Sequence, residues 1–451
     1  MKVAITKNSW LKDSDLRLDA SFHLSQSIQI KHLFQKSPYI LSTIGDQSDQ
    51  IFSGNIFKRV YVNNPYNGIP YITGSDMIKQ DIDSGKYISK KQAHYLQNLI
   101  LKKDWILVSC SGTLGNTVFT NELFQNRIAT HDLIRILPNS KDVLNGFLYA
   151  YLSSKYGYSL LTQSSYGGVV KHIEPEHIEN IPVPIFPENK QLEIHNLIVE
   201  STELRVEANK LQREAIDLIE NTLPLIGQTK QYVSSISNLS KNNLRFDAST
   251  NFTNIELFYN KLTVKYNMPT IEELSEKVFT PNIFKRLRVD NPVFGIPFLS
   301  GSDLLDAMPT FNSFLSKRMK NIDDYILRNG WIAIQDAGTI GYVTLVNGYL
   351  DGVAATNNLV RVVPKKTSAN YYIYAFLKTQ QGQAILKSYE YGSVQKHIDN
   401  NQVSQIKIPI LPEYEVITNK MSEYLRKTTE ACNKENQAIQ LVENEIEQWQ
   451  H

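Results

Sequence analysis

The chain has 451 residues, too long for one typical domain, so two or more hydrophobic cores are expected. Hydrophobic residues make up 42% and charged residues 20%, which argues against intrinsic disorder and against a fibrous chain. The formal net charge of +2 is far below that of a nonspecific nucleic-acid coat, so any DNA binding must use local patches or a partner.

The first half of the chain predicts a domain of mixed α and β structure. Short β-branched and aromatic runs at Ile69–Ile72, Trp105–Val108 and Leu133–Leu137 are typical of strands, and each ends at Gly, Ser, Asn or Pro. Phe147–Ser159 has apolar residues at spacings of three and four, which predicts a helix. In the second half, Tyr371–Lys387 predicts the corresponding helix.

The second half of the chain repeats the first. Asn55–Met77 and Asn282–Leu304 are identical at 14 of 23 positions, and Trp105–Phe119 matches Trp331–Leu345 at nearly the same offset. Because a period above 200 residues is too long for a solenoid, the repeat indicates a duplicated domain of about 180 residues.

A proline-rich exit follows each copy and leads into a long charged segment without Gly or Pro. In the first segment, leucines fall at intervals of seven, which is coiled-coil spacing; in the second, two apolar seams run side by side, with Glu435 as the poorest fit. Two helices with narrow apolar stripes would pack most simply on each other in antiparallel orientation, although each could lie on its own domain instead. The expected helix–helix interface consists of Leu197, Leu204, Leu211, Leu218, Met421, Leu425, Ile439, Val442 and Ile446.

These patterns predict an α/β (mixed α+β) protein in which two homologous domains are separated by two long antiparallel coiled-coil helices, with pseudo-twofold symmetry. The expected divisions are 1–188 for the first domain, 189–228 for the first helix and linker, 229–412 for the second domain, and 413–451 for the second helix.

The sequence lacks the usual catalytic motifs. It has no Walker A, dinucleotide-binding, zinc-hydrolase or serine-esterase motif, so no enzyme activity of its own is expected. Its two cysteines, Cys110 and Cys432, are too few for a disulfide framework or a structural zinc site. No apolar run is long enough for a membrane span, and Met1–Leu11 lacks the apolar core of a secretory signal, so a cytoplasmic protein with no membrane partner is expected.

One segment resembles a catalytic motif imperfectly. Asn63–Tyr66 is similar to the Asn-Pro-Pro-Tyr box with which amino-methyltransferases hold a flipped adenine, but the first proline is missing. The corresponding Asp290–Val293 also lacks the aromatic residue that would stack on the base. We therefore interpret both Asn-Pro pairs as turns.

Polar residues at matching positions of the two copies are candidates for DNA contact. The paired cations of each copy could contact phosphates or end a solvated strand, and the shared Gly-Thr-x-Gly turn could admit a ligand or serve only as a turn. The candidates are Lys58, Arg59, Ser109, Ser111, Thr113, Lys171 and His172 in the first copy, and Lys285, Arg286, Gln335, Thr339, Lys396 and His397 in the second.

With these motifs in view, the chain resembles the specificity (S) subunit of Type I restriction-modification systems along almost its whole length. That family commonly has a Gly-Thr-Ile-Gly turn, here Gly112–Gly115 and Gly338–Gly341, and an Ile-Pro exit followed by a glutamine, here Ile181–Pro184 with Gln191. The second exit departs from the pattern, since Val416 stands near the expected glutamine.

The resemblance implies a protein that recognises a split DNA sequence through two target-recognition domains. It also implies recruitment of two methyltransferase (M) subunits and, in full systems, two motor-nuclease (R) subunits. The cofactors would then be used by those partners: S-adenosylmethionine for methylation, ATP and Mg for restriction, and none bound by this chain. Two alternatives stay open, a recognition subunit of a Type II system with a combined methylase-nuclease, and a bilobal protein scaffold that does not bind DNA.

The length of the helices sets the expected spacing of the target. Roughly 30 helical residues at ~1.5 Å each span about 45 Å, somewhat more than one DNA turn of ~34 Å. Two domains separated by that distance would meet half-sites on successive turns, and antiparallel helices would place those half-sites in inverted orientation.

Overall fold

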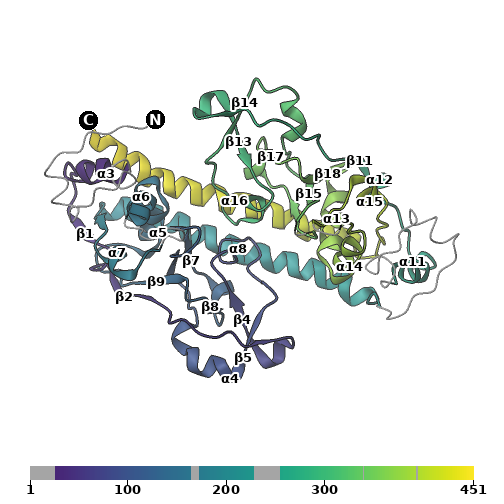
Figure 1. The fold of residues 1–451 in the computed structure, drawn as a ribbon, viewed down its shortest axis with the longest axis horizontal. Coiled ribbons are helices and arrows are strands. Elements are labelled where there is room, and N and C mark those ends of the chain that lie inside the picture. Colours follow the sequence, from purple (N-terminus) through teal and green to yellow (C-terminus); the bar gives the residue numbers. More distant parts are fainter. Residues whose placement is uncertain (1–25, 164–171, 228–253, 339, 393–394, 451) are drawn as a thin grey trace. The chain divides into compact units, whose positions relative to one another are not determined.

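The structure, a computed structural model, divides into two compact units (Figure 1). Unit 1 comprises Met1–Val206 with Glu430–His451, and unit 2 comprises Glu207–Thr429. Each unit thus contains one copy of the repeat together with part of each long helix. The residues that the structure describes are 26–163, 172–227, 254–338, 340–392 and 395–450.

Unit 1 is built from short strands, helices on one side of a sheet, and parts of the two long helices α8 and α16. Its elements in chain order are α3 (Gln26–Phe34), β1 (Leu41–Thr43), β2 (Ser48–Ser53), β3 (Tyr61–Val62), η1 (Pro65–Asn67), β4 (Gly68–Ile72), β5 (Tyr87–Ser89), α4 (Lys90–Ala93), η2 (His94–Leu99), β6 (Ile106–Ser109), β7 (Thr117–Phe119), η3 (Glu122–Phe124), β8 (Ile128–Ala129), β9 (Leu133–Pro138), α5 (Asn145–Ser153), α6 (Lys155–Gln163), α7 (Pro175–Glu179), β10 (Pro182–Pro184), α8 (Glu188–Thr222), and the end of α16 (Tyr414–Glu447) with η8 (Gln448–Gln450).

The central sheet of unit 1 has the strand order β2-β9-β6-β7, and all its pairs are antiparallel. Both faces of the sheet are covered. Ile106 and Val108 of β6 pack into a core that includes α5, whereas Leu107 packs on the opposite side with Met77. Burial on both faces explains why β6 and β9 are almost continuously apolar in sequence.

A second sheet of unit 1 has the order β3-β5-β4-β8. Its β4–β8 pair is parallel, with Tyr71 opposite Ile128 and Ile72 opposite Ala129. The strands β1 and β10 form a separate antiparallel pair, in which β10 is part of the proline-rich exit. The core on the β3-β5-β4-β8 sheet contains Tyr71, Ile88 and Ile128, all fully buried.

Unit 2 repeats the two four-stranded sheets of unit 1. Its sheets run β11-β18-β15-β16 and β12-β14-β13-β17, and its β13–β17 pair is parallel like β4–β8. Its elements are α11 (Ile255–Thr263), α12 (Ile271–Leu274), β11 (Ser275–Phe279), β12 (Arg288–Val289), η4 (Pro292–Phe294), β13 (Gly295–Leu299), η5 (Asp303–Leu305), β14 (Phe314–Ser316), η6 (Ile322–Tyr325), β15 (Ile332–Gln335), β16 (Val343–Leu345), η7 (Gly348–Leu350), β17 (Ala354–Ala355), β18 (Leu359–Pro364), α13 (Thr367–Lys378), α14 (Gln380–Ser388) and α15 (Asn400–Ser404). The predicted duplication and mixed α/β class are confirmed.

The helix predicted after each sheet is in fact two helices, so that part of the prediction is wrong. Ser154 separates α5 from α6, and Thr379 separates α13 from α14, each with an extended backbone near φ −67° and ψ 160°. The break is compact because a glycine follows it. A Cβ on Gly157 or Gly382 would lie 2.2 Å from a carbonyl oxygen of the preceding helix. Apolar periodicity continues across the break and therefore did not reveal it.

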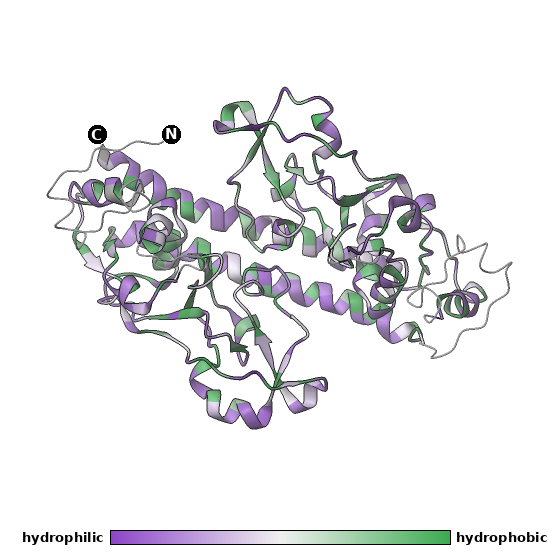
Figure 2. Ribbon diagram, viewed as in Figure 1, coloured by the Kyte–Doolittle hydropathy of each residue, from purple (hydrophilic) through white to green (hydrophobic). Residues whose placement is uncertain are grey.

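The two long helices are present as predicted, and within each unit their segments lie antiparallel. In unit 1, Lys190 pairs with Glu445 at 2.5 Å and Lys434 pairs with Glu200 at 2.7 Å. In unit 2, Lys420 pairs with Glu214 at 2.6 Å, and Lys427 pairs with Glu207. Figure 2 shows both helices as largely hydrophilic with apolar stripes. None of the helices in the described ranges is long and apolar enough to cross a membrane.

The residues buried along α8 differ from the expected leucine series. The leucines Leu197, Leu204, Leu211 and Leu218 are half-buried. One series of buried positions alternates at spacings of four and three and consists of Ile194, Ile198, Ser201, Arg205, Ala208, Gln212, Ala215 and Ile219; Gln191, Thr202 and Asn209 are buried as well. On α16 the buried positions include Met421, Leu425, Val442 and Ile446, whereas Ile439 is half-buried. Small and polar side chains thus occupy the centre of the stripe, and the leucines flank it.

Candidate nucleic-acid interface

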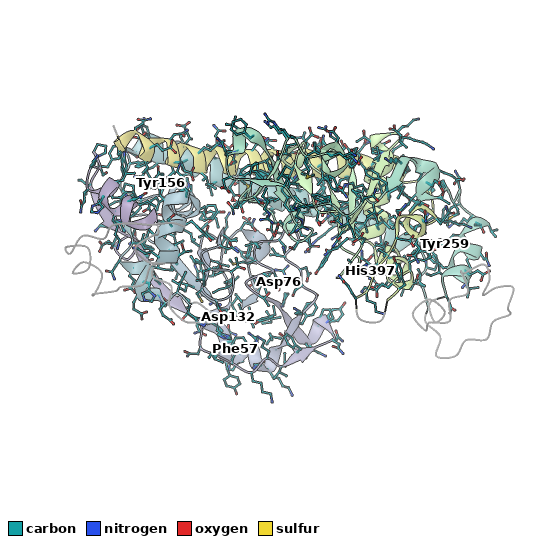
Figure 3. The ribbon with its side chains drawn as sticks, turned by 45° about the horizontal axis from the view of Figure 1, so that its top comes forward. Phe57, Asp76, Asp132, Tyr156, Tyr259 and His397 are labelled. Atoms are coloured by element: carbon teal, nitrogen blue, oxygen red, sulfur yellow. The ribbon has the colours of Figure 1, made fainter. Side chains whose placement is uncertain are left out.

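The polar candidates of unit 1 gather where two parallel strands end. The strands β4 and β8 run in the same direction, so the segments that follow them, Thr73–Asp76 and Thr130–Asp132, lie at the same edge of the sheet. The backbone N–H of Thr130 donates to the carbonyl of Ile72 at 3.0 Å. Figure 3 shows Asp76 and Asp132 in the same region of the unit.

The end of β6 joins the same region through backbone hydrogen bonds. The N–H of Cys110 donates to the carbonyl of Asp132 at 3.2 Å, and the N–H of Ile173 donates to the carbonyl of Cys110 at 3.1 Å. Ser111 also forms an antiparallel bridge with His172. We call this set loop cluster 1; it consists of Thr73–Asp76, Ser109–Gly115, Thr130–Asp132 and His172.

Unit 2 contains the same arrangement. The N–H of Asp336 donates to the carbonyl of Asn358 at 3.3 Å, and the N–H of Ile398 donates to the carbonyl of Asp336 at 3.0 Å. Ala337 forms an antiparallel β-bridge with His397. We call this set loop cluster 2; it consists of Ser300–Asp303, Gln335–Gly338 with Ile340 and Gly341, Thr356–Asn358, and Lys396–His397. The candidate residues at 109–113 and 172 therefore come together in unit 1, as do those at 335 and 396–397 in unit 2.

The shared Gly-Thr-x-Gly turn has a structural reason in its backbone. Gly112 and Gly115 have φ angles of 73° and 78°, and Gly338 and Gly341 have 81° and 99°, a region that favours glycine. Ser109 is buried and supports this turn, because its Oγ donates to the carbonyl of Thr113 at 2.6 Å and accepts from the N–H of Asn116 at 3.0 Å. Ser109 is thus an internal support, while Thr113 is exposed.

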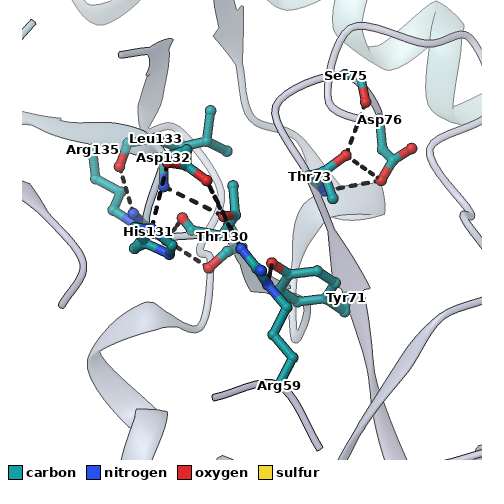
Figure 4. Close-up of polar contacts among 11 residues, drawn as sticks. Arg59, Tyr71, Thr73, Ser75, Asp76, Thr130, His131, Asp132, Leu133 and Arg135 are labelled. Carbon is teal, nitrogen blue, oxygen red and sulfur yellow. Dashed lines mark hydrogen bonds and ion pairs between the residues drawn. The ribbon is translucent and has the colours of Figure 1, made fainter. Parts of the chain in front are cut away.

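The repeated arginines have different environments in the two units. In unit 1, Arg59 Nε donates to the Tyr71 hydroxyl at 2.7 Å, and its Nη2 donates to Thr130 Oγ1 at 3.2 Å and lies 3.8 Å from Asp132 Oδ2 (Figure 4). The hydrogen bond to Tyr71 raises the pKa of Arg59. In unit 2 the guanidinium of Arg286 lies over the Phe298 ring, 5.2 Å from its centroid.

The other cationic candidates lie on the surface. Lys58, Lys285 and Lys396 are exposed, while His172, His397, Ser111 and Gln335 are half-buried. The N–H of Gly338 donates to the carbonyl of Lys396 at 3.2 Å, which ties the Lys396–His397 segment to the glycine turn. Lys171 and Thr339 lie outside the described residues.

A buried arginine, which the sequence patterns did not single out, supports each cluster. Arg135 on β9 is fully buried and donates to the carbonyls of Leu133 at 2.6 Å, Ala129 at 3.0 Å and Thr130 at 3.1 Å (Figure 4). Arg361 on β18 does the same with the corresponding carbonyls of Leu359, Ala355 and Thr356. Burial lowers the pKa of each to about 10. The sequence did contain a signal for these residues, because an arginine interrupts the corresponding apolar strand in both copies of the repeat.

The residue between β6 and the glycine turn differs between the units. Burial raises the pKa of Asp336 to about 6, and the nearby His397 and Arg361 offset part of that effect. Its Oδ1 is buried without a hydrogen-bond partner among the described residues. Cys110 takes its place in unit 1, where burial raises the pKa of the thiol to about 11. The chain therefore carries a partly buried carboxyl in one cluster and a neutral thiol in the other.

The clusters contain hydroxyl, amide, imidazole, carboxylate and guanidinium groups on closely matched backbones. These are the donors and acceptors with which proteins contact base edges and phosphates. Within the described ranges there is no group of three or more His, Cys, Asp or Glu side chains that could hold a metal ion. The arrangement is suited to polar recognition by two similar scaffolds with different side chains.

Comparison with protein families gives two matches to one family, one for each copy of the repeat. The family model described as the Type I restriction modification DNA specificity domain matches residues 42–215 and again residues 263–441. No curated protein matches the chain.

Three solved structures are similar to the chain over most of its length. One is the S subunit of a Type I restriction-modification system from M. genitalium, with 13% identity, a TM-score of 0.33, and coverage of 91% of this chain and 94% of that chain. A second comes from a study of complex assembly in a Type I system, with 12% identity, a TM-score of 0.30, and coverage of 92% and 98%. The third is the HsdS subunit from Thermoanaerobacter tengcongensis, with 12% identity, a TM-score of 0.29, and coverage of 91% and 96%.

Proposed function

Because the chain belongs to the Type I restriction-modification DNA specificity family, we propose that each unit recognises one half of a bipartite DNA target through its loop cluster. The observation that carries this proposal is the pairing of a constant backbone with variable side chains. The backbone links from β6 to the 130–132 segment recur in unit 2, whereas the side chains that they present change.

The changed side chains alter hydrogen-bonding chemistry. Asp132 corresponds to Asn358, and His131 corresponds to Asn357. A carboxylate only accepts hydrogen bonds, whereas an amide both donates and accepts, and one such change alters base preference by ~1–3 kcal/mol per contact. The two half-sites should therefore be related without being identical.

Catalysis is assigned to partner subunits in this proposal. The chain recruits two methyltransferase subunits, which use S-adenosylmethionine, and in full systems two restriction subunits, which use ATP and Mg. The absence of the corresponding motifs from the whole sequence supports this division. Purified alone, the chain is expected to show no methyl transfer, ATP hydrolysis or DNA cleavage.

Methylome sequencing of a host that carries the complete system tests the proposal. We expect one methylated motif of two short, inverted half-sites separated by a few unspecified bases, and its loss when this chain is deleted. A continuous motif, or a methylome unchanged by the deletion, would contradict the proposal. A matched control replaces residues 109–132 by their counterparts 335–358, which should alter one half-site and leave the other unchanged.

A further inference from the structure

The repeated arginine has the same origin in both units but not the same set of partners. Arg59 and Arg286 occupy the fifth position of the identical Asn-Ile-Phe-Lys-Arg segments. In each unit the guanidinium lies near an aromatic ring, 5.7 Å from the centroid of Tyr71 on β4 and 5.2 Å from that of Phe298 on β13. The two arginines therefore occupy corresponding positions of the fold, and each lies near the corresponding ring.

In unit 1 the guanidinium is held by acceptors of the protein. Tyr71 is fully buried, so its hydroxyl is a fixed acceptor for Arg59 Nε. Asp132 accepts a hydrogen bond from Thr130 Oγ1 at 3.0 Å and lies 3.4 Å from His131 Nε2, which keeps its carboxylate beside Arg59. About a third of the Arg59 side chain remains exposed, so the ion pair with Asp132 is screened and weak by itself. The three acceptors, on Tyr71, Thr130 and Asp132, thus lie beside two of the guanidinium nitrogens, Nε and Nη2.

In unit 2 one of those acceptors is missing and another has lost its charge. Phe298 has the ring of Tyr71 without its hydroxyl, and Asn358 has an uncharged amide where unit 1 has Asp132. The Asn358 Oδ1 accepts from Asn357 Nδ2 at 2.7 Å. Arg286 is exposed, as Arg59 is, but within the part of the chain that the structure describes it has no ion pair or protein hydrogen bond. The guanidinium lies over the Phe298 ring, and none of its five N–H donors has an acceptor among the described residues.

We propose that Arg286 binds DNA directly, whereas Arg59 is a positioning residue that holds Asp132 and does not reach DNA. The residue pair at 71 and 132, or at 298 and 358, decides which role the arginine has. This rests on the proposed function and deepens it, because it assigns an asymmetric contact to two matching clusters. The ligand atoms are oxygen or nitrogen acceptors of DNA, either a phosphate or the O6/N7 edge of guanine.

Exchange of the residue pair tests the proposal. Tyr71→Phe with Asp132→Asn should free Arg59, and Phe298→Tyr with Asn358→Asp should hold Arg286. The full chain, assembled with its methyltransferase subunits, is titrated with duplex DNA carrying the methylated motif over a range of salt concentrations, and base preference is read from a randomised library.

The single variants give the first comparison. Arg286→Ala should lower affinity about tenfold, while Arg59→Ala should leave direct contacts in place and lower it less than about threefold. If Arg286 contacts a phosphate, its removal reduces the slope of log affinity against log salt by ~0.9; if it contacts guanine, the preference at one position of one half-site is lost. Equal effects of the two variants, or no change in slope and preference for Arg286→Ala, would overturn the proposal.

The exchanged pairs give the second comparison and do not depend on removing an arginine. Tyr71→Phe/Asp132→Asn should gain a DNA contact, seen as a steeper salt slope or a new base preference. Adding Arg59→Ala should abolish that gain. Phe298→Tyr/Asn358→Asp should reproduce the loss of affinity and of salt slope or base preference caused by Arg286→Ala, although the arginine is still present. Failure of both exchanges in assembled complexes would overturn the proposal, whereas wild-type protein without any sequence preference would overturn the proposed function itself and this inference with it.

Discussion

The two units differ in the polar contacts that the helix after the central sheet, α5 or α13, makes with α8 and α16. Tyr149 on α5 of unit 1 and Tyr374 on α13 of unit 2 occupy matching positions and are both buried. The Tyr149 hydroxyl donates to Glu435 Oε1 at 2.6 Å, and Glu435 forms a buried ion pair with Arg205. Gln212 donates instead to the Tyr374 hydroxyl at 2.7 Å, and Tyr424 lies 3.4 Å from it.

The comparison shows that a duplicated domain can keep its fold while one copy buries charge and the other does not. In unit 1, burial opposes the charged form of Arg205, but the adjacent Glu435 more than offsets this and raises its pKa. Ser201 adds a hydrogen bond, because Arg205 Nη1 donates to its Oγ at 2.9 Å. In unit 2 the same space holds neutral groups. A buried pair stabilises little in net terms, but removing one member is costly.

The largest expected effect comes from breaking that ion pair. Glu435→Ala should destabilise unit 1 by about 3–5 kcal/mol, because Arg205 is left buried without its counter-charge. Gln212→Ala, the matched change in unit 2, should cost only about 1–2 kcal/mol, because an amide hydrogen bond is lost. Hydrogen exchange in urea, followed separately for peptides of each unit, measures both.

A paired substitution provides the control for this experiment. Arg205→Met with Glu435→Leu removes both charges at once and should restore most of the lost stability. If Glu435→Ala is no more destabilising than Gln212→Ala, the pair is not buried in solution.

A smaller effect is expected from Asp336, whose pKa is raised from 3.8 to about 6 by burial. Between these pH values the folded state keeps a proton that the unfolded state has lost, so the stability of unit 2 falls as the pH rises from about 4 to about 6. The shift from 3.8 to about 6 corresponds to a loss of at most about 3 kcal/mol. Asp336→Asn should remove this pH dependence and make unit 2 more stable than the wild type at pH 7.

Unit 1 supplies the comparison for that pH dependence. Cys110 stands in the place of Asp336, and a thiol whose pKa is raised to about 11 stays neutral throughout the acidic range. Cys110→Ser should therefore leave the stability profile between pH 4 and 6 unchanged. Urea unfolding at a series of pH values checks both variants, and an identical profile for Asp336→Asn and wild type would contradict the assignment.

The smallest effect concerns the exposed lysines, which the two units share. Lys58→Ala and Lys285→Ala should each reduce the magnitude of the salt slope of DNA binding by ~0.9 if each contacts one phosphate. Lys102→Ala is a matched control, because Lys102 is exposed but precedes β6 and so lies at the end of that strand opposite Ser109. Unchanged slopes in both variants would place the two lysines in solvent.

The sequence by itself determined the duplication, the mixed α and β class, the strands at Ile69, Trp105 and Leu133, and the two long helices. These features are encoded locally, because apolar periodicity reflects which side of an element is buried. The repeat added information that a single domain lacks, since matching segments must occupy matching places. It drew attention to Lys58, Arg59 and the glycine turn, and it also contained the signal for Arg135 and Arg361.

Only the tertiary structure decided which of those residues share a site and what each one contacts. The parallel β4–β8 pair brings Tyr71 and Thr130 to one edge from positions 59 residues apart, and no local pattern encodes that pairing. Likewise, Glu435 is a poor fit to an apolar seam until Arg205 and Tyr149 are seen beside it. The breaks at Ser154 and Thr379 depend on close approach of a glycine to the preceding helix, which is a property of packing and not of periodicity. Contacts between residues far apart in sequence depend on the assembled fold, and that is why the partners of Arg59 and Arg286 could not be derived from the repeated segment that contains them.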